Sequence, residues 1–340
     1  MGCLRPSPSR LLAALLAAAA LVGAVAGCGG ASRPESPRAQ AQDAARAFLD
    51  AYVDGDGRVV RRDQGGDTVS EGQAYGMLAA VVAGDPVRFE RIWAWTAAHL
   101  RHPDGLLSWH WQDGHASDVQ TASDADLDTA HALLLAAHRF RHPALARESR
   151  RMADAMREKE VRNGVVLPGA WALSLPSPGL MNPSYVDPRG LQALHMDDVA
   201  RASQAAIAPL LTGGHAPPDW AAVGPPPAAA AGPGGSGGPS GYGFDAARLP
   251  VRLAASCDPA DRRLAAGLTG LQQANGSGSP VFLVARAAQA SAAGDRARMA
   301  SLLDEAQARQ HDHATYYGAA WVALGRALLQ TDLLGRCPAG

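Results

Sequence analysis

Along most of the chain, apolar residues recur every three or four positions, which is the spacing of one face of an α-helix. This pattern predicts helices that begin at Ser70 and Ser123, and further helices over 39–54, 89–100, 143–161, 189–211, 259–273, 279–290, 293–310 and 314–334. Short turns separate these segments, and only 165–175 is expected to be an extended excursion. The abundance of alanine also favours helix. The sequence therefore predicts an all-α fold.

Aspartates occupy three alternate positions at the start of the helix that begins at Ser123. Ser123 is predicted to cap this helix, with Asp126 as its capping partner three residues later. Acidic residues in a first turn complement the helix dipole by ~0.3–1 kcal/mol each, so one or two of them require no function. Asp124, Asp126 and Asp128 together exceed what capping needs. We therefore expect a functional use of this charge at an outward-facing helix end.

A calcium-binding loop is one alternative for these aspartates. They have the spacing of the first, third and fifth positions of an EF-hand loop. The sixth position of that loop requires glycine and the twelfth requires glutamate, but this sequence has Thr129 and Leu135 there. The calcium interpretation therefore fails at two positions.

A single glutamate occupies a similar place in the helix that begins at Ser70. Ser70 and Gln73 match a capping box, which places Glu71 in the first helical turn. A lone glutamate at such a position is most simply a capping residue. A functional role for Glu71 needs support from other parts of the sequence.

That support comes from a resemblance that extends over several blocks of the chain. The stretch 122–140 resembles the signature helix of glycoside hydrolase family 8, which runs Ala, Ser or Thr, Asp, Ala or Gly, Asp, and then an apolar helix ending in Phe or Trp. Only Thr129 departs from the family preference, which is Ile or Met, and this affects packing under the site. Matching residues are Ala122, Ser123, Asp124, Ala125, Asp126, Ala130, Ala132, Leu133, Ala136 and Phe140. Further blocks that resemble the family are 57–59, 70–78, 182–185 and 243–250.

The resemblance implies both an architecture and a chemistry. It implies an (α/α)6 barrel of six inner and six outer helices over 39–334. By similarity, Glu71 is the general acid, Asp245 is the general base that activates water, and Asp124 holds the sugar ring at the cleavage point. An inverting enzyme of this kind places its acid and base ~6.5–9.5 Å apart. The helix dipole lowers the pKa of Glu71, so burial beside another carboxylate such as Asp124 must raise it.

Other side chains in or near the family blocks are candidate substrate contacts. Tyr75 and Tyr185 belong to blocks of the resemblance, and Arg248 follows the predicted base by one turn, where a cation favours an ionised carboxylate. Trp109 and Trp111 are expected outside a helix, and tryptophans near a carboxylate cleft commonly stack on the apolar face of a sugar ring. The alternatives are core packing for the tryptophans and an ordinary i,i+3 salt bridge for Arg248.

Composition limits the range of partners. The formal net charge is -1, so nothing favours binding to nucleic acid, and 47% hydrophobic residues in 340 positions suffice for one large domain. His311 and His313 lack a third ligand at helical spacing, and we assign no metal and no cofactor. A monomer that acts on a β-linked polysaccharide is expected.

The N-terminus has the features of an export signal. Arg5 and Arg10 precede an apolar run over 11–26 that is short for a membrane span. We expect a lipoprotein-type signal peptide over 1–27, lipidation of Cys28 as the only membrane attachment, and a flexible tether over 28–38. Ordinary cleavage after Ala26, with secretion, is the alternative.

The remaining predictions concern domain organisation, the disulfide and the substrate. A catalytic domain is expected over 39–340, with a Pro/Gly/Ala-rich surface loop at 214–241 that packs no core. Because Cys3 leaves with the signal peptide and Cys28 carries lipid, Cys257 and Cys337 are expected to form a disulfide outside the cytoplasm. The resemblance favours an endo-β-1,4-glucanase. Xylan, lichenan or chitosan are alternative substrates, and a non-catalytic glycan-binding lipoprotein is the alternative of another class.

Overall fold

The computed structural model describes residues 35–176, 179–224, 227–233, 241–272 and 278–337, together with Gly2. The expected signal peptide, Cys3 and the expected lipidation site Cys28 lie outside the described residues. Among the helices of the described part, none combines the length and the apolar character needed to span a bilayer.

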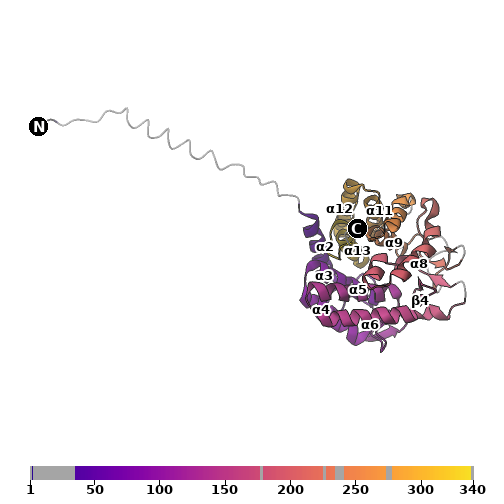
Figure 1. Ribbon diagram of the computed structural model, residues 1–340. Coiled ribbons are helices and arrows are strands. Elements are labelled where there is room, and N and C mark those ends of the chain that lie inside the picture. Colours follow the sequence, from indigo (N-terminus) through magenta and orange to yellow (C-terminus); the bar gives the residue numbers. More distant parts are fainter. Residues whose placement is uncertain are drawn as a thin grey trace. The chain divides into compact units, whose positions relative to one another are not determined.

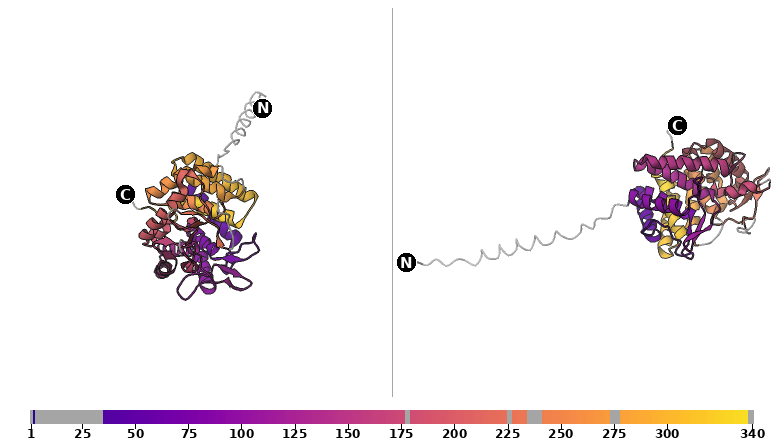
Figure 2. Two further views of the ribbon diagram at one scale, coloured as in Figure 1. Left: turned by 90° about the vertical axis from the view of Figure 1, so that its right-hand side faces the viewer. Right: turned by 90° about the horizontal axis from the view of Figure 1, so that it is seen from below.

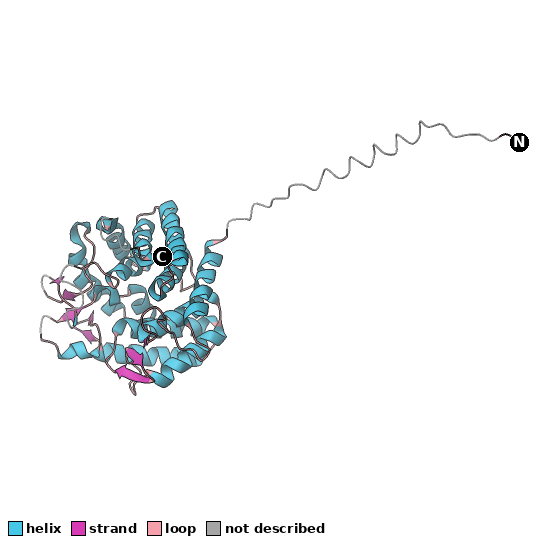
Figure 3. Ribbon diagram, turned by 180° about the vertical axis from the view of Figure 1, so that it is seen from behind, coloured by secondary structure: helices cyan, strands magenta, loops and turns pink. Residues whose placement is uncertain are grey.

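Helices make up most of the described chain (Figures 1 and 3). Within the described residues there are twelve α-helices, which confirms the all-α prediction. They are α2 (Pro37–Tyr52), α3 (Ser70–Ala83), α4 (Pro86–His99), α5 (Ser123–Arg139), α6 (Pro143–Lys159), α7 (Pro188–Ala193), α8 (Asp197–Ile207), α9 (Leu249–Ala255), α10 (Pro259–Gly267), α11 (Pro280–Ala292), α12 (Arg296–Asp312) and α13 (Tyr316–Gln330).

Alternate helices form an inner and an outer layer. The odd-numbered helices contact one another in order from α3 to α13, and α13 returns to α3, so that they close a ring. The even-numbered helices lie outside: α4, α6, α8, α10 and α12 each pack on the preceding inner helix, and α2 packs on α13 and α3. Figure 2 shows indigo α2 beside yellow α13, where the two ends of the domain meet. This arrangement is the expected (α/α)6 barrel.

The two layers differ in sequence as their surroundings require. Every residue of inner helix α3 except Glu71 and Ala83 is buried, whereas outer helix α6 buries only one stripe. A helix that is apolar on all sides must be surrounded by other elements, and an amphipathic one covers a core with one face. Of the two exceptions in α3, Glu71 lies in the first turn of the helix, where the barrel opens.

Two predicted helices are shorter than expected. The segment 189–211 contains α7 and α8, which are separated at His195, where φ is +59°. This left-handed backbone cannot continue an α-helix, and Asp197 then begins α8 with acidic charge at its N-terminus. The segment predicted over 259–273 ends as an α-helix at Gly267. Short 3₁₀ helices occur at η2 (Ala170–Ser174), η3 (Pro183–Tyr185), η4 (Ala208–Gly214), η6 (Ala246–Arg248) and η7 (Thr269–Gln272).

Short antiparallel strands line the loops between helices. One sheet has the order β1–β2–β3, with Val69 opposite His110, and it holds the start of α3 against the loop that carries Trp109. The other pairings are β4 with β5, and β6–β7–β8. The strands are β1 (Thr68–Val69), β2 (His110–Gln112), β3 (His115–Asp118), β4 (Val161–Arg162), β5 (Val165–Val166), β6 (Leu180–Met181), β7 (Ala221–Ala222) and β8 (Ala228–Ala229).

The sheet β6–β7–β8 corrects one expectation about the loop 214–241. Trp220 is only 8% exposed and Ala221 is fully buried, opposite Met181. The prediction that this segment packs no core is therefore wrong at these two residues. Its Pro, Gly and Ala content obscured a short strand, because alanine carries little strand signal.

The predicted disulfide between Cys257 and Cys337 is present, with the two Cα atoms 5.2 Å apart. It joins the segment after α9 to the chain that follows α13, across 80 positions. We expect a Cys257→Ala, Cys337→Ala double variant to lose about 4 kcal/mol of unfolding free energy, because the open chain gains loop entropy when it unfolds. Urea unfolding of the two proteins measures this difference. Equal stability of the variant and the oxidised wild type would contradict the expectation.

Candidate active site

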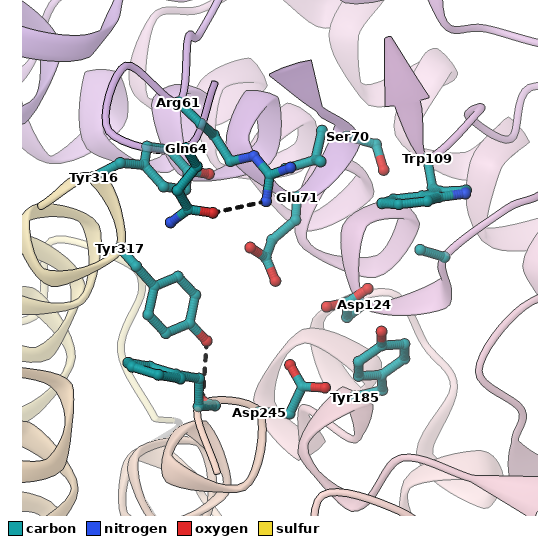
Figure 4. Close-up of a pocket in the computed structure, with 13 residues that line it drawn as sticks. Arg61, Gln64, Ser70, Glu71, Trp109, Asp124, Tyr185, Asp245, Tyr316 and Tyr317 are labelled. Carbon is teal, nitrogen blue, oxygen red and sulfur yellow. Dashed lines mark hydrogen bonds between the residues drawn. The ribbon is translucent and has the colours of Figure 1, made fainter. Parts of the chain in front are cut away.

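A pocket of about 480 Å³ opens where the N-terminal ends of several inner helices meet (Figure 4). Three carboxyl groups, five aromatic side chains and several polar groups line it. The lining residues are Arg61, Gln64, Val69, Ser70, Glu71, Trp109, Ala122, Asp124, Tyr185, Phe244, Asp245, Tyr316 and Tyr317.

The three carboxyl groups come from distant parts of the sequence. Glu71 lies in the first turn of α3, directly after β1, and Asp124 lies in the first turn of α5. Asp245 precedes η6, the 3₁₀ turn that leads into α9. Because α3, α5 and α9 are all inner helices of one barrel, their starts bring these carboxyl groups to one mouth. Figure 4 shows all three directed into the pocket.

One buried guanidinium contacts all three carboxyl groups. Arg248 is fully buried, and its Nη1 donates to Glu71 Oε2 and to Asp124 Oδ2, each at 2.6 Å. Its Nη2 donates to Asp245 Oδ1 at 2.8 Å. A buried cation is tolerated only when it is paired, and here the partners are the carboxyl groups of the site. Arg248 therefore fixes the relative positions of Glu71, Asp124 and Asp245.

The surroundings raise the pKa of two of these carboxyl groups. Burial is the largest cause for Glu71; Arg248 lowers its pKa, Asp124 and Asp245 raise it, and the result is about 7. Burial also raises the pKa of Asp124, although the Arg248 cation opposes this. The side chain of Glu71 is 22% exposed and faces the pocket, so its proton can reach a bound molecule. Glu71 therefore has the protonation behaviour of an acid that works near neutral pH.

Asp245 is held at both oxygens. Oδ1 accepts from Arg248, and Oδ2 accepts from Asn182 Nδ2 at 2.9 Å. The side chain is 34% exposed, so it remains open to the pocket. Asp219 supports the same turn, because its Oδ1 accepts from the backbone N–H groups of Gly243 and Ala246. The geometry thus orients one carboxyl group toward the solvent side of the pocket.

Comparison with known proteins identifies the family. A family model described as Glycosyl hydrolases family 8 matches residues 36–231, which is more than half of the chain. The chain belongs to glycosyl hydrolase family 8. The matched region includes Glu71 and Asp124 and ends before Asp245.

Relatives and solved structures agree with this family. A probable endoglucanase of Novacetimonas hansenii is 35% identical over 238 residues, which cover 65% of this chain and 69% of that protein. An endoglucanase of Xanthomonas axonopodis pv. citri is 34% identical over 171 residues, covering 42% of this chain and 44% of that protein. The fold matches an endo-beta-1,4-glucanase from Acetobacter xylinum with a TM-score of 0.66 at 25% identity, over 86% of this chain and 99% of that one. A beta-1,3-1,4-glucanase from Paenibacillus sp. X4, 18% identical, matches the fold with a TM-score of 0.74, over 88% of this chain and 93% of that one.

Aromatic rings form the walls of this family 8 pocket. Trp109 and Tyr185 line it, where the sequence prediction places sugar contacts, and Trp109 is stacked on His110 with ring centroids 4.7 Å apart. Phe244 is 51% exposed, and Tyr317 donates from its hydroxyl group to the Phe244 carbonyl. Flat apolar rings beside carboxyl groups suit the apolar faces of pyranose units.

Three of the predicted substrate contacts do not line this pocket. Tyr75 is 1% exposed, and its hydroxyl group accepts from Arg248 and from Trp321 Nε1. Trp111 packs edge-on against Trp95, with centroids 5.4 Å apart. Arg248 itself is fully buried, so it holds carboxyl groups and does not face a substrate. The burial of Tyr75 and Arg248 favours a supporting role for both, whereas the sugar contact of the half-buried Trp111 stays a prediction.

The structure also corrects the roles of the other acidic residues at the start of α5. Asp126 is fully buried and accepts from the Leu107 backbone N–H at 2.9 Å, away from the pocket. Asp128 forms a buried bidentate ion pair with Arg252, at 2.8 and 2.9 Å. Of the three aspartates, only Asp124 lines the pocket. Asp124 therefore faces the pocket mouth as expected, whereas Asp126 and Asp128 are engaged inside the protein and do not point outward.

Both predicted helix caps are displaced by one residue. Ala122 and Val69 occupy the N-cap positions of α5 and α3, and neither helix start has a side-chain cap. Ser123 donates to the Leu167 carbonyl instead. Gln73 does not cap α3, because it bonds to other buried groups: its Oε1 accepts from Val59 N, and its Nε2 donates to Thr96. Buried polar groups need partners, and this requirement overrides the local capping pattern.

The sequence prediction missed several residues of the site, among them the lining residues Arg61, Gln64, Phe244, Tyr316 and Tyr317. Asn182 and Asp219, also missed, orient Asp245 and its turn, as described above. The available signal was that Asn182 lies in the block 182–185 and that Asp219 lies in 218–220, a short stretch that also resembles the family. Within the described residues, no group of three potential ligands is arranged to hold a metal ion, and His311 and His313 are exposed.

Proposed function

We propose that this family 8 protein is an endo-β-1,4-glucanase that cleaves with inversion of configuration. The observation that carries the proposal is the set of three carboxyl groups joined by Arg248 in an aromatic-lined pocket. The names of the relatives described above, several of them endoglucanases, support the substrate class. A complete set of carboxyl groups argues against a protein that only binds glycan.

Glu71 is the proposed general acid. Its pKa of about 7 keeps a large part of it protonated at neutral pH, and it is accessible from the pocket. Cleavage of a glycosidic bond requires that the leaving oxygen receive a proton as the bond to carbon breaks. Glu71 donates that proton and is left as a carboxylate, which the adjacent Arg248 stabilises.

Asp245 is the proposed general base. It accepts hydrogen bonds from a cation and from an amide, which suits an anionic carboxyl group, and it keeps 34% of its side chain exposed. It takes a proton from water as the water oxygen attacks the anomeric carbon. Asp124 is the proposed sugar-holding residue, because it lines the same pocket as these two groups and Arg248 fixes its orientation.

The aromatic walls favour a neutral, unbranched glycan. Trp109, Tyr185 and Tyr317 present ring surfaces on different sides of the carboxyl groups (Figure 4), and Phe244 also lines the pocket. Successive β-1,4-linked glucose units present apolar faces that such rings bury without a demand for hydrogen bonds. Xylan, lichenan and chitosan chains share this property, so the substrate needs a direct assay.

We expect the wild-type protein to release reducing sugar from carboxymethylcellulose faster than from xylan, lichenan or chitosan. Proton NMR of the first product should show the α configuration at the new reducing end, because water attacks the face opposite the leaving group. A first product with the β configuration would overturn both the inverting mechanism and the role of Asp245. Faster release from one of the other three polysaccharides would keep the mechanism and reassign the substrate.

A further inference from the structure

Behind the pocket, two carboxyl groups are in contact in the protein interior, and the proposed mechanism uses neither of them. Asp126 lies on α5, and Glu160 is the residue that ends α6; both are fully buried. Asp126 Oδ1 accepts from Leu107 N at 2.9 Å, and Glu160 Oε1 accepts from Thr121 Oγ1 at 2.5 Å. Each of the two carboxyl groups also shifts the pKa of the other through a side-chain hydrogen bond between them.

The second oxygen of each carboxyl group shows what this contact requires. Asp126 Oδ2 and Glu160 Oε2 are buried, and neither has a donor among the residues that the structure describes. Two ionised carboxylates supply only acceptors, so they cannot satisfy each other. A single proton placed between the two groups turns one of them into a donor and gives the other a hydrogen bond to accept. One proton bound between Asp126 and Glu160 would therefore supply the donor that the pair lacks.

The neighbouring charges also favour a bound proton. Asp124 on α5 and Asp104 in the turn before Leu107 both act on Glu160 with negative charge. The nearby cation Lys159 is bonded to Asp104 at 2.7 Å, and His102 also lies near Asp104. Arg248 is engaged by the carboxyl groups of the pocket. Two uncompensated charges in this interior would be strongly unfavourable.

The pair joins the segments that carry two pocket residues. Leu107, bonded to Asp126, lies two positions before Trp109. Thr121, bonded to Glu160, lies two positions before the start of α5 at Ser123 and also accepts from Ala170 N. Both connections therefore end close to side chains of the site.

We propose that Asp126 and Glu160 share one proton in the folded protein, and that this pair positions Asp124 and Trp109. The positioning part rests on the proposed function, whereas the shared proton can be tested without any activity. Neither residue touches the substrate; both act through the segments that they hold.

The direction of the pH effect follows from burial. Burial raises the pKa of both carboxyl groups, that of Glu160 to about 7, whereas in the unfolded chain both ionise near their ordinary values of about 4. Between these values the folded protein holds a proton that the unfolded chain has lost. Stability contributed by the pair is therefore fully present at acid pH and declines as the pH rises through about 7.

The first test counts this proton. In Glu160→Gln the amide can donate to Asp126 in place of the proton, and its carbonyl can still accept from Thr121. Urea unfolding of wild type and variant between about pH 5 and pH 6, where the folded pair holds its proton and the unfolded chain does not, gives the number of protons released on unfolding from the slope of unfolding free energy against pH; we expect the variant to release about one fewer. Asp126→Asn, which keeps a donor toward Glu160, should give the same change. Glu158→Gln, at an exposed position of α6, is the matched control with an unchanged count.

The second test asks whether the pair positions the site. Glu160→Ala leaves Asp126 and Thr121 without their partner, so we expect kcat on carboxymethylcellulose to fall about tenfold or more below that of Glu160→Gln, because small displacements of reacting groups cost rate. Equal kcat for these two variants would overturn the positioning role. An unchanged proton count in both Glu160→Gln and Asp126→Asn would overturn the shared proton. If wild type hydrolysed no glycan, the proposed function would fail, and the proton count would still decide the pair.

Discussion

Glu71→Gln should lower kcat for glucan hydrolysis by about 10²–10⁴-fold while leaving glucan binding nearly unchanged. Gln has the shape of the acid but no proton to give to a leaving oxygen, and its contacts within the pocket wall are otherwise similar. Reducing-sugar release gives kcat, and isothermal titration with a soluble cello-oligosaccharide gives the binding constant. Glu90→Gln, at an exposed position of α4, is the control. Retention of wild-type kcat by Glu71→Gln would remove the general acid from the proposal.

The pH dependence gives an independent check on the same residue. The pKa of Glu71 is about 7, and only the protonated form can act as the acid. The kcat/KM of the wild type should therefore fall as the pH rises through about 7. The residual activity of Glu71→Gln should lack this alkaline decline, because the titrating group is gone.

Apolar spacing and the abundance of alanine were sufficient to predict the fold class: outer helices such as α6 follow the 3.6-residue pattern, and inner helices such as α3 are apolar on nearly all sides. It could not predict which residues meet. Glu71 and Arg248 are bonded although they are 177 positions apart, and no local pattern records such a contact. Only the resemblance to a family connected these blocks before the structure did.

The sequence also could not predict how deeply a side chain lies in the barrel or in which direction it points. Tyr75 lies one turn after Glu71 on the same helix face, but that turn places it below the pocket floor. Trp109 and Trp111 lie two positions apart and would share a face of a regular strand. The pairing register shifts between His110 and Trp111, so Trp109 lines the pocket while Trp111 packs on Trp95.

The spacing of Asp124, Asp126 and Asp128, by contrast, already indicated that their side chains do not share one direction. Side chains two positions apart on a helix point to different sides. Asp124 and Asp126 could not both face one mouth, and the structure directs Asp126 to Leu107 in the interior. Asn182 and Asp219 were missed for another reason: each orients the Asp245 turn from a distant segment.

The removal of Arg248 should affect both stability and catalysis. Arg248→Met leaves Glu71, Asp124 and Asp245 close together without their shared cation. Loss of one partner from a buried ion pair typically costs about 3–5 kcal/mol, and we expect a loss of this size near neutral pH. Urea unfolding measures it, with Arg150→Met, at an exposed position of α6, as the matched control. Arg248→Lys keeps the charge, but a single ammonium group cannot reproduce the fork that reaches all three carboxyl groups, so we expect only partial recovery.

The same variant should shift the pH profile in a defined direction. Arg248 lowers the pKa of Glu71 and of Asp124, so its removal should raise both. The alkaline decline of any residual activity should then move to higher pH. The stability deficit of Arg248→Met should be small at pH 5, where the carboxyl groups can hold protons, and should grow as the pH rises and the folded state alone retains them. A deficit independent of pH would mean that Arg248 contributes packing, and that charge pairing does not hold the three carboxyl groups together.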